Sequence, residues 1–175
     1  MKYQKVILAR GVRPLNISIE GEEIMSVVRR AALKDLEAIL KLEKLYFGSP
    51  KENFESLFKL KTPNEECVFF VAEKNEKVIG YSRMHLFKWY EGAHIVTIVV
   101  DRKYRRKSYG TLLMKEMEKF ARNKGMKVIT LDTSPDNIEA LIFYLKNGFR
   151  ICGYRDKLEE KGKPIIYLSK KLRET

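Results

Sequence analysis

A strand, a helix and a second strand follow one another in the central part of the chain, and this alternation constrains the fold more than any other feature. The two strands are the apolar segments Ala93–Val100 and Val128–Thr133. The segment between them, Tyr109–Lys124, repeats its apolar residues with helical spacing and is followed by Gly125, a common helix stop. Because strands joined through a helix lie parallel in one sheet, the sequence predicts an α/β core.

Further helices and strands flank this unit. A helix is expected over Asp136–Asn147, where Asp136 and Glu139 have the spacing of a capping box and Gly148 follows the end. We therefore expect a single α/β (α+β) domain with a mixed sheet of about seven strands and about four helices. The other expected strands are Ser26–Arg30, Cys67–Glu73, Val78–Leu86, Arg150–Asp156 and Pro164–Leu172, and the other expected helices contain Leu33–Leu45 and Phe54–Leu60.

The length of 175 residues fits one domain. No internal repeat, low-complexity segment or linker rich in Pro, Gly and Ser divides the chain. The first 25 residues stand apart, because two short strands are expected at Lys5–Arg10 and Asn16–Glu20 before Gly21 breaks the pattern. We expect a short β extension over residues 1–25 and a domain over residues 26–172.

The chain is strongly basic, with 35 Lys and Arg residues against 23 Asp and Glu and a net charge of +12. This charge favours an anionic partner, but it does not choose among nucleic acid, a membrane surface and a phosphorylated cofactor. No apolar run approaches the ~20 residues of a membrane span. The N-terminal apolar stretch, Val6–Ala9, is also too short for the core of a signal peptide. We therefore expect a cytoplasmic protein without a membrane partner.

The two cysteines, Cys67 and Cys152, are too few for a disulfide scaffold. With only His85 and His94 beside them, a zinc cluster is not expected either, and no metal is predicted. Reduced thiols agree with a cytoplasmic location. Lys and Glu abound while Gln4 is the only glutamine, a bias that resembles the composition of hyperthermophile proteins.

The segment Ile98–Thr111 combines the features of an anion-binding turn. A buried strand ends at Asp101, five of the six residues from Arg102 to Lys107 are basic, and a helix begins near two small residues, Ser108 and Gly110. Free amides of a first helical turn, the helix dipole and nearby basic side chains together suit a pyrophosphate. A solvated basic turn without a ligand has the same pattern. The segment has neither the Gly-Lys-Ser/Thr of a P-loop nor a Gly-x-Gly-x-x-Gly fingerprint.

A second pattern lies on the helix expected near the C-terminus. It reads Asn137-x-x-Ala140-x-x-Phe143-Tyr144-x-x-x-Gly148-Phe149. Helical spacing places Asn137, Ala140 and Tyr144 along one side, so an amide and a phenol share a surface. Taken alone, the pattern also fits a polar first turn and a tyrosine of the core.

Together the two segments resemble the GNAT superfamily of acetyl-CoA-dependent N-acetyltransferases, and most closely its ribosomal-protein alanine N-acetyltransferase-like members. The family's (Gln/Arg)-x-x-Gly-x-(Gly/Ala) segment reads Arg105-Arg106-Lys107-Ser108-Tyr109-Gly110 here, and its Asn-x-x-Ala-x-x-(Phe/Leu)-Tyr-x-x-x-Gly-Phe segment matches at every fixed position. The resemblance covers roughly Val27 to Leu172. Ser108 departs from it, since the family usually has glycine there. Coenzyme affinity suffers if the site needs a glycine conformation, but serine is small and its hydroxyl can donate to a phosphate.

The resemblance implies acetyl-CoA as cosubstrate, direct attack by a primary amine and a tetrahedral intermediate, with no acyl-enzyme. Tyr144 would be the general acid that protonates the departing thiolate. A backbone N–H of the strand at Ile98–Val100 would stabilise the oxyanion. Cys67 and Cys152 match no nucleophile position. The residues implied to bind the coenzyme are Ile98, Val99, Val100, Arg105, Arg106, Lys107, Ser108, Tyr109, Gly110, Thr111 and Asn137.

Two residues are candidates for the base that deprotonates the amine. Asp132 matches the place where ribosomal-protein alanine acetyltransferases carry a glutamate, and His94 matches the place where histone-type members carry one. We prefer Asp132, because its strand leads into the Asn137–Tyr144 helix and its carboxylate should share a cleft with the acid. A turn residue at Asp132 and a packed histidine at His94 are the alternatives, and His85 is expected to be structural.

The acceptor is a primary amine, in a protein N-terminus, a lysine or a small molecule. Its specificity is expected to reside in Tyr46–Lys61, Phe87–Gly92 and Tyr154–Pro164. Both a monomer and a homodimer fit the sequence. The alternative function is a basic nucleic-acid-binding or ribosome-associated module without catalysis. No RNP, zinc-finger or helix-turn-helix pattern favours it, so a nucleic-acid partner is not expected.

Overall fold

The computed structural model describes residues 15–19, 22–50, 52–156 and 162–172. In these residues eight strands form one sheet in the order β1-β2-β3-β4-β5-β6-β8-β7. All neighbours are antiparallel except β5 and β6, which are parallel. The strands are β1 Leu15–Ile19, β2 Glu22–Arg30, β3 Glu65–Lys74, β4 Lys77–Phe87, β5 Gly92–Val100, β6 Val128–Thr133, β7 Arg150–Arg155 and β8 Ile165–Lys171.

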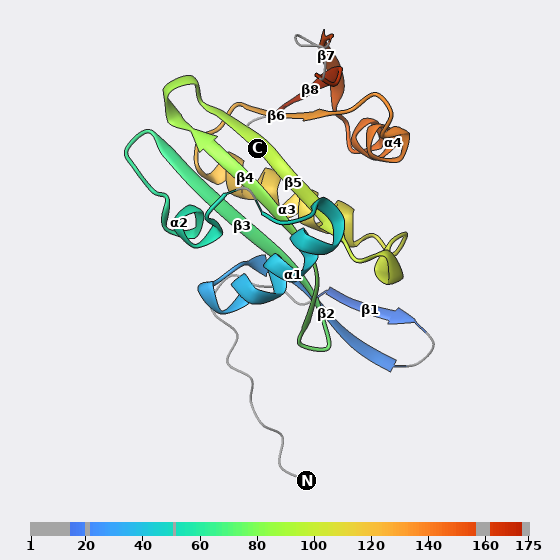
Figure 1. Cartoon of the computed structure of the whole chain (residues 1–175). Helices are drawn as coiled ribbons and strands as arrows, with labels where there is room; N and C mark the ends of the chain where they lie inside the picture. Colours follow the sequence, from blue (N-terminus) through green and yellow to red (C-terminus); the bar gives the residue numbers. More distant parts are fainter. Residues whose placement is uncertain (1–14, 20–21, 51, 157–161, 173–175) are drawn as a thin grey trace.

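Helices cover both faces of the sheet (Figure 1). The first two pack on one face and the third on the other, where the fourth lies beside it. Three short 3-10 turns complete the described structure, at Leu33–Asp35, Lys88–Tyr90 and Arg102–Tyr104. The helices are α1 Leu36–Phe47, α2 Phe54–Lys59, α3 Tyr109–Asn123 and α4 Ile138–Lys146.

The predicted fold class is confirmed. Seven of the eight strands, β2 to β8, form the expected mixed-sheet domain with the four helices, and the parallel strand pair flanks α3 as the alternation predicted. The strand expected at Asn16–Glu20 is β1, whereas the one expected at Lys5–Arg10 lies outside the described residues. β2 pairs with β1 up to Ser26 and with β3 from Ser26 onward. The division of the chain after residue 25 stays a prediction.

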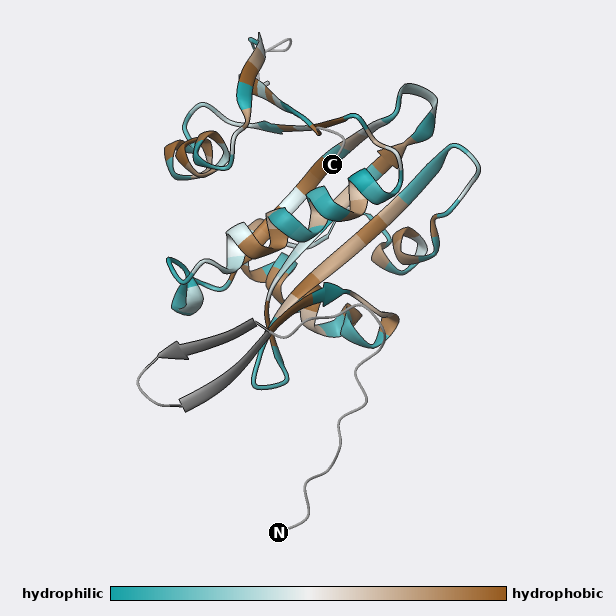
Figure 2. Ribbon diagram, turned by 180° about the vertical axis from the view of Figure 1, so that it is seen from behind, coloured by the Kyte–Doolittle hydropathy of each residue, from teal (hydrophilic) through white to brown (hydrophobic). Residues whose placement is uncertain are grey.

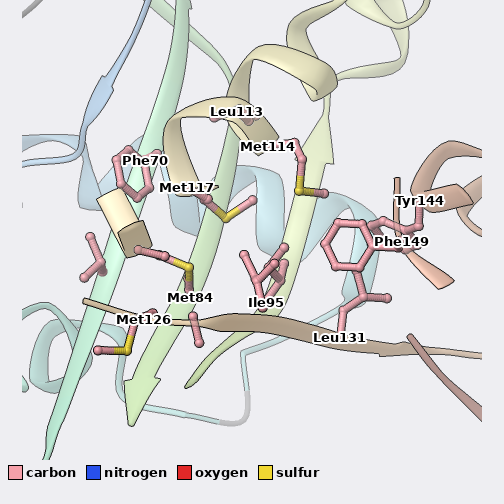
Figure 3. Packing of buried hydrophobic residues seen from close by; sticks show 14 of the residues in the cluster. Phe70, Met84, Ile95, Leu113, Met114, Met117, Met126, Leu131, Tyr144 and Phe149 are labelled. Carbon is pink, nitrogen blue, oxygen red and sulfur yellow. The ribbon is translucent and has the colours of Figure 1, made fainter. Parts of the chain in front are cut away.

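The larger part of the core lies between the sheet and α3. Figure 2 shows α3 crossing this face of the sheet, and Figure 3 shows its apolar side chains packed on the strands. Four methionines join this core: Met84, Met114, Met117 and Met126. Met side chains are flexible enough to fill irregular gaps between packed layers. This packing holds the first turn of α3 in place beside the end of β5.

The predicted capping box of α4 is wrong. The helix begins at Ile138, so its N-cap is Asn137, whose Oδ1 accepts a hydrogen bond from the Ala140 amide at 3.2 Å. The Asp136 amide instead donates to Ser134 Oγ in the turn before the helix. The prediction placed the helix start too early, and a capping box requires the acid three residues after the cap.

β5 and β6 part halfway along their length, and this creates the site. Their pairing ends at Ile95 and Leu131. At the same place β5 contains a bulge, since Ile95 and Thr97 pair with adjacent residues of β4 and leave Val96 as the extra residue. Beyond the bulge β5 pairs only with β4, and β6 pairs only with β8. The edge of β5 toward β6 therefore has no strand partner beyond Ile95.

Candidate active site

A cleft of about 520 Å³ lies where the two strands part, between the first turns of α3 and α4. Its lining includes the whole end of β5 from Val96 to Val100 and the end of β6. Most residues that the sequence analysis singled out line it, whereas Lys107 and His94 do not. The predicted residues in the lining are Ile98, Val99, Val100, Arg105, Arg106, Ser108, Tyr109, Gly110, Thr111, Asp132, Asn137 and Tyr144.

The first turn of α3 forms part of the cleft wall, with Gly110 and Thr111 among the lining residues. Ser108 is the N-cap with a φ of 64°, and its side chain makes no capping hydrogen bond. The first bond of the helix ladder runs from the Leu112 amide to the Ser108 carbonyl at 3.0 Å. The amides of Gly110 and Thr111 lie ahead of that bond, at the positive end of the helix dipole. This geometry suits a phosphate group.

Ser108 adopts the left-handed conformation that glycine favours, as does Arg106 with a φ of 60°. For a residue with a side chain, this conformation costs about 1 kcal/mol or more. Serine therefore adopts, at a cost in backbone strain, the conformation that glycine favours at this position. Gly110 has a different role, because a Cβ there would lie 3.3 Å from the Phe143 ring of α4. Its small size lets α3 and α4 approach closely at the cleft.

Arg105 is held on the wall of the cleft by three groups. Its Nε donates to the Val100 carbonyl at 3.1 Å, and its guanidinium lies over the Tyr46 ring at 5.3 Å from the centroid. Its Nη1 also lies 3.8 Å from Glu139 Oε2 across the cleft. A second hollow of about 510 Å³ is lined by Tyr46, Arg102, Arg105, Arg106 and Glu139. The basic turn therefore faces a space of the size that an anionic ligand needs.

Tyr144 places a buried phenol in the cleft. It is only 9% exposed, and its ring packs against Phe143 and Phe149. Burial, together with the charge of Asp132, raises the pKa of Tyr144 to about 12. The phenol therefore keeps its proton at neutral pH and is available as a hydrogen-bond donor.

The two candidate bases, Asp132 and His94, are neighbours rather than separate alternatives. His94 Nε2 lies 3.3 Å from Asp132 Oδ1. The hydrogen bond from His94 is the main reason that the pKa of Asp132 lies below its ordinary value. Asp132 lines the cleft, and His94 lies behind it on β5. The expectation that Asp132 and Tyr144 share one cleft agrees with this placement.

Several cleft residues were not singled out as site residues from the sequence. Tyr46 and Phe47, at the end of α1, fall within the segment expected to hold acceptor specificity, and Tyr46 Oη accepts a hydrogen bond from the Arg102 amide at 2.7 Å. The turn Phe87–Gly92 does not line the cleft, because it lies at the opposite end of β5 from Val100. The expected segment Tyr154–Pro164 is only partly described. Phe143 was noted only as a position of the helix motif and Glu139 only for the capping box, whereas Thr133 carried no signal beyond ending its strand.

In the described part of the chain, no group of three or more His, Cys, Asp or Glu residues is placed to hold a metal ion. Among the same residues, no helix has both the length and the apolar character needed to span a bilayer.

Comparison with known proteins decides the family. The model of the acetyltransferase (GNAT) family matches residues 33–149, which is more than half of the chain. The chain belongs to the GNAT family. It is an N-acetyltransferase that uses acetyl-CoA as cosubstrate and transfers the acetyl group to an amine. The alternative of a nucleic-acid-binding module without catalysis is not supported by these relatives.

Two curated relatives resemble this GNAT protein over most of their length. An uncharacterized N-acetyltransferase from Methanocaldococcus jannaschii is 31% identical over 151 residues, which cover 83% of this chain and 91% of the relative. An N-alpha-acetyltransferase from Sulfurisphaera tokodaii is 30% identical over 136 residues, which cover 70% of this chain and 79% of the relative.

Solved structures share the fold at lower identity. Ard1 from Thermoplasma volcanium has a TM-score of 0.72 at 22% identity, covering 85% of this chain and 99% of its own. Arabidopsis thaliana Naa50 has a TM-score of 0.70 at 19% identity, and the match covers 83% of this chain and 97% of Naa50. That structure is a complex with a bisubstrate analogue that joins coenzyme A to a peptide.

Proposed function

We propose that this acetyltransferase modifies the α-amine of protein N-termini. The observation that carries the proposal is the apolar surface beside the reacting groups. Phe47 is 59% exposed and Val96 is 42% exposed, and both line the cleft that contains Asp132 and Tyr144. Exposed apolar side chains at a binding site suit the first side chain of a peptide. The relative from Sulfurisphaera tokodaii named for N-alpha-acetylation supports the same acceptor class.

The first turn of α3 and the basic turn before it bind the coenzyme A pyrophosphate. The amides of Gly110 and Thr111 donate to it, and Arg105 and Arg106 supply the opposite charge. Asn137 contributes its Nδ2, since its Oδ1 is used to cap α4. Lys107 lies outside the cleft lining and acts only through its charge.

The unpaired edge of β5 binds the pantetheine arm through its backbone. Residues Ile98–Val100 line the cleft and have no strand partner on the β6 side. Edge backbone groups of this kind pair readily with an extended amide chain. One of these N–H groups also stabilises the oxyanion that develops on the thioester carbonyl. When bound, acetyl-CoA supplies the activated acetyl group.

Tyr144 and Asp132 carry the proton transfers. Tyr144 protonates the departing thiolate, a transfer that is uphill in water and requires the close geometry of the cleft. Asp132 lies in the same cleft and removes a proton from the acceptor ammonium, directly or through one water. Neither cysteine takes part, because Cys67 is buried in the core and Cys152 lies on β7.

We also infer a cytoplasmic location, which two free thiols in the described structure support. The glutamine-poor, Lys- and Glu-rich composition supports a thermophilic source.

The acceptor class can be tested with acetyl-CoA and a set of amines, by following free thiol and locating the acetyl group by mass spectrometry. The set contains peptides that differ in the first residue, the same peptides with a blocked N-terminus and an internal lysine, and spermidine. We expect transfer to free α-amines, with a preference for an apolar first residue. Transfer only to lysine or spermidine would overturn the proposal.

A pair of matched variants tests the apolar surface. Phe47→Ala should reduce kcat/KM about tenfold for peptides with an apolar first residue, because it removes exposed apolar area at the cleft. Leu45→Ala is the control, since Leu45 is 67% exposed on the same helix and does not line the cleft. Equal effects of the two substitutions would contradict the placement of the acceptor.

A further inference from the structure

Three polar contacts bear on where the protons of His94 lie. The Thr130 hydroxyl donates its single hydrogen to the Ala93 carbonyl, with 3.2 Å between the oxygens. The same hydroxyl oxygen lies 3.0 Å from His94 Nδ1, and with its hydrogen on the carbonyl it accepts there. In this arrangement Nδ1 carries a hydrogen. In a neutral imidazole the other nitrogen, Nε2, then has only a lone pair, and it faces Asp132 Oδ1 at 3.3 Å.

A lone pair facing a carboxylate oxygen is unfavourable, so one proton belongs between the two atoms. It is held either on the ring, as imidazolium beside carboxylate, or on the carboxyl group. We propose that His94 and Asp132 act as one base that holds a single exchangeable proton, and that Thr130 is the positioning residue which keeps His94 in the Nδ1–H form. This inference rests on the proposed acetyl transfer, and it joins two residues that sequence reasoning had treated as alternatives.

The position of the pair in the cleft determines which of the two residues receives the acceptor's proton first. Asp132 lines the cleft, while His94 lies behind it and is reached through the carboxylate. The acceptor's proton therefore arrives at Asp132 and comes to rest on His94 Nε2. The side chain of Asp132 is 42% exposed and that of His94 is 30% exposed, so the proton can leave to solvent once the product has gone.

The protons balance over the reaction. An ammonium acceptor loses two protons when it becomes an amide. The first passes to the carboxylate–imidazole pair before attack, which breaks an N–H bond and forms the Nε2–H bond of an imidazolium. The second leaves nitrogen after the new C–N bond forms and replaces the proton that Tyr144 gives to the thiolate when the C–S bond breaks. The pair returns its proton to water, and no other reactant is required.

Other ionisable groups face the pair from the neighbouring elements. On the cleft side Tyr144 feels the charge of Asp132, and Arg155 of β7 favours the charged form of that carboxylate. On the other side His85 of β4 pairs in register with His94, and its Nδ1 is bonded to Glu65 Oε1 at 2.7 Å. The enzyme is active when the His94–Asp132 pair has lost its shared proton. The acidic limb of the pH profile of kcat/KM therefore reports the protonation of the pair as a unit, and not of either residue alone.

The position of the hydrogen can be tested without any activity measurement. The chain contains only two histidines, His85 and His94, so ¹⁵N NMR of the labelled full-length protein resolves both rings. A His85→Gln variant assigns the signals. We expect neutral His94 to carry its hydrogen on Nδ1 in the wild type and in Thr130→Ser. Thr130→Val removes the acceptor and should move the hydrogen to Nε2, while His85 stays unchanged. A hydrogen on Nε2 of neutral His94 in the wild type would overturn the proposal.

Kinetics test the paired role. Thr130→Val should shift the acidic limb of the kcat/KM profile and lower the plateau about tenfold, and Thr130→Ser should restore both. Ser169→Ala is the control, because Ser169 is the residue of β8 that pairs with Thr130.

His94→Gln and Asp132→Asn should lower kcat/KM by similar factors, and the double variant should be little worse than either. Additive losses in the double variant, or an unchanged profile in Thr130→Val, would contradict a shared base. If no amine is acetylated, the NMR result still decides the tautomer, so the two proposals fail separately.

Discussion

The first turns of two helices meet at the cleft, and they are built differently. At α3 the N-cap Ser108 is left-handed, its side chain makes no capping bond, and basic residues precede it. At α4 the N-cap Asn137 bonds the Ala140 amide, and Glu139 adds a negative charge to the first turn. A bound phosphate needs free amides and positive charge, which α3 offers and α4 does not. We therefore propose that the amides of α3 bind the coenzyme phosphate, whereas α4 contributes through the side chains of Asn137 and Tyr144.

The largest effect should come from the phenol of α4. Tyr144→Phe should lower the rate of the chemical step roughly 10²-fold, because it removes the proton donor for the thiolate. Coenzyme affinity and folding should hardly change, since the ring still fills the same space between Phe143 and Phe149. Single-turnover rates and calorimetry with coenzyme A measure the two properties. Tyr154→Phe, at a residue that is 61% exposed on β7, is the control for loss of a hydroxyl. An unchanged chemical step would make Tyr144 a core residue only.

The basic turn before α3 should show the opposite behaviour. Arg105→Glu combined with Arg106→Glu should weaken coenzyme A binding at least tenfold, about 1.4 kcal/mol or more. The single-turnover rate at saturating acetyl-CoA should fall far less. Lys107→Glu is the control for one charge reversal outside the cleft, because Lys107 is exposed and does not line it. If Lys107→Glu weakened binding as much as the double substitution, general charge rather than the cleft would explain the affinity.

Two substitutions of Asn137, the N-cap of α4, distinguish its structural role from its role in coenzyme binding. Asn137→Ala should lower the free energy of unfolding by about 1 kcal/mol through loss of the cap. Asn137→Asp keeps an oxygen acceptor and should restore stability, but it lacks the Nδ2 donor and should bind coenzyme A several-fold more weakly. Denaturant unfolding and calorimetry on both variants give the answer. Wild-type coenzyme affinity in Asn137→Asp would limit this residue to capping.

The cap of α3 should give the smallest effect. Ser108→Gly should stabilise the fold by roughly 0.5–1 kcal/mol, because glycine adopts the left-handed conformation without strain and this gain exceeds its entropy cost. Ser108→Ala keeps the strain, so its stability should match that of the wild type. Thermal unfolding of the three proteins measures the difference. A loss of stability in Ser108→Ala would show that the hydroxyl, rather than the backbone, stabilises this turn.

Local patterns were enough to predict most of the elements, and the family resemblance supplied most of the predicted residues that line the cleft. The alternation around α3 and the helix-stop glycines depend on short-range spacing, which a sequence displays directly. The contact between His94 and Asp132 depends instead on the register of β5 and β6, in which His94 lies opposite Thr130. Register between parallel strands is determined by the whole packed core, so the sequence could present these two residues only as alternatives. The capping box at Asp136 failed for a related reason, because the turn after β6 decides where α4 starts.

Amide NMR tests the contrast between the two helices most directly. Titration of the ¹⁵N-labelled protein with coenzyme A should shift the amides of Gly110 and Thr111 strongly downfield, because they gain hydrogen bonds to phosphate oxygens. The amides of Glu139 and Ala140 should move much less, since the first turn of α4 is capped by Asn137 and carries an acid. Larger shifts in the first turn of α4, with those of α3 unmoved, would contradict the assignment of α3 as the phosphate-binding helix.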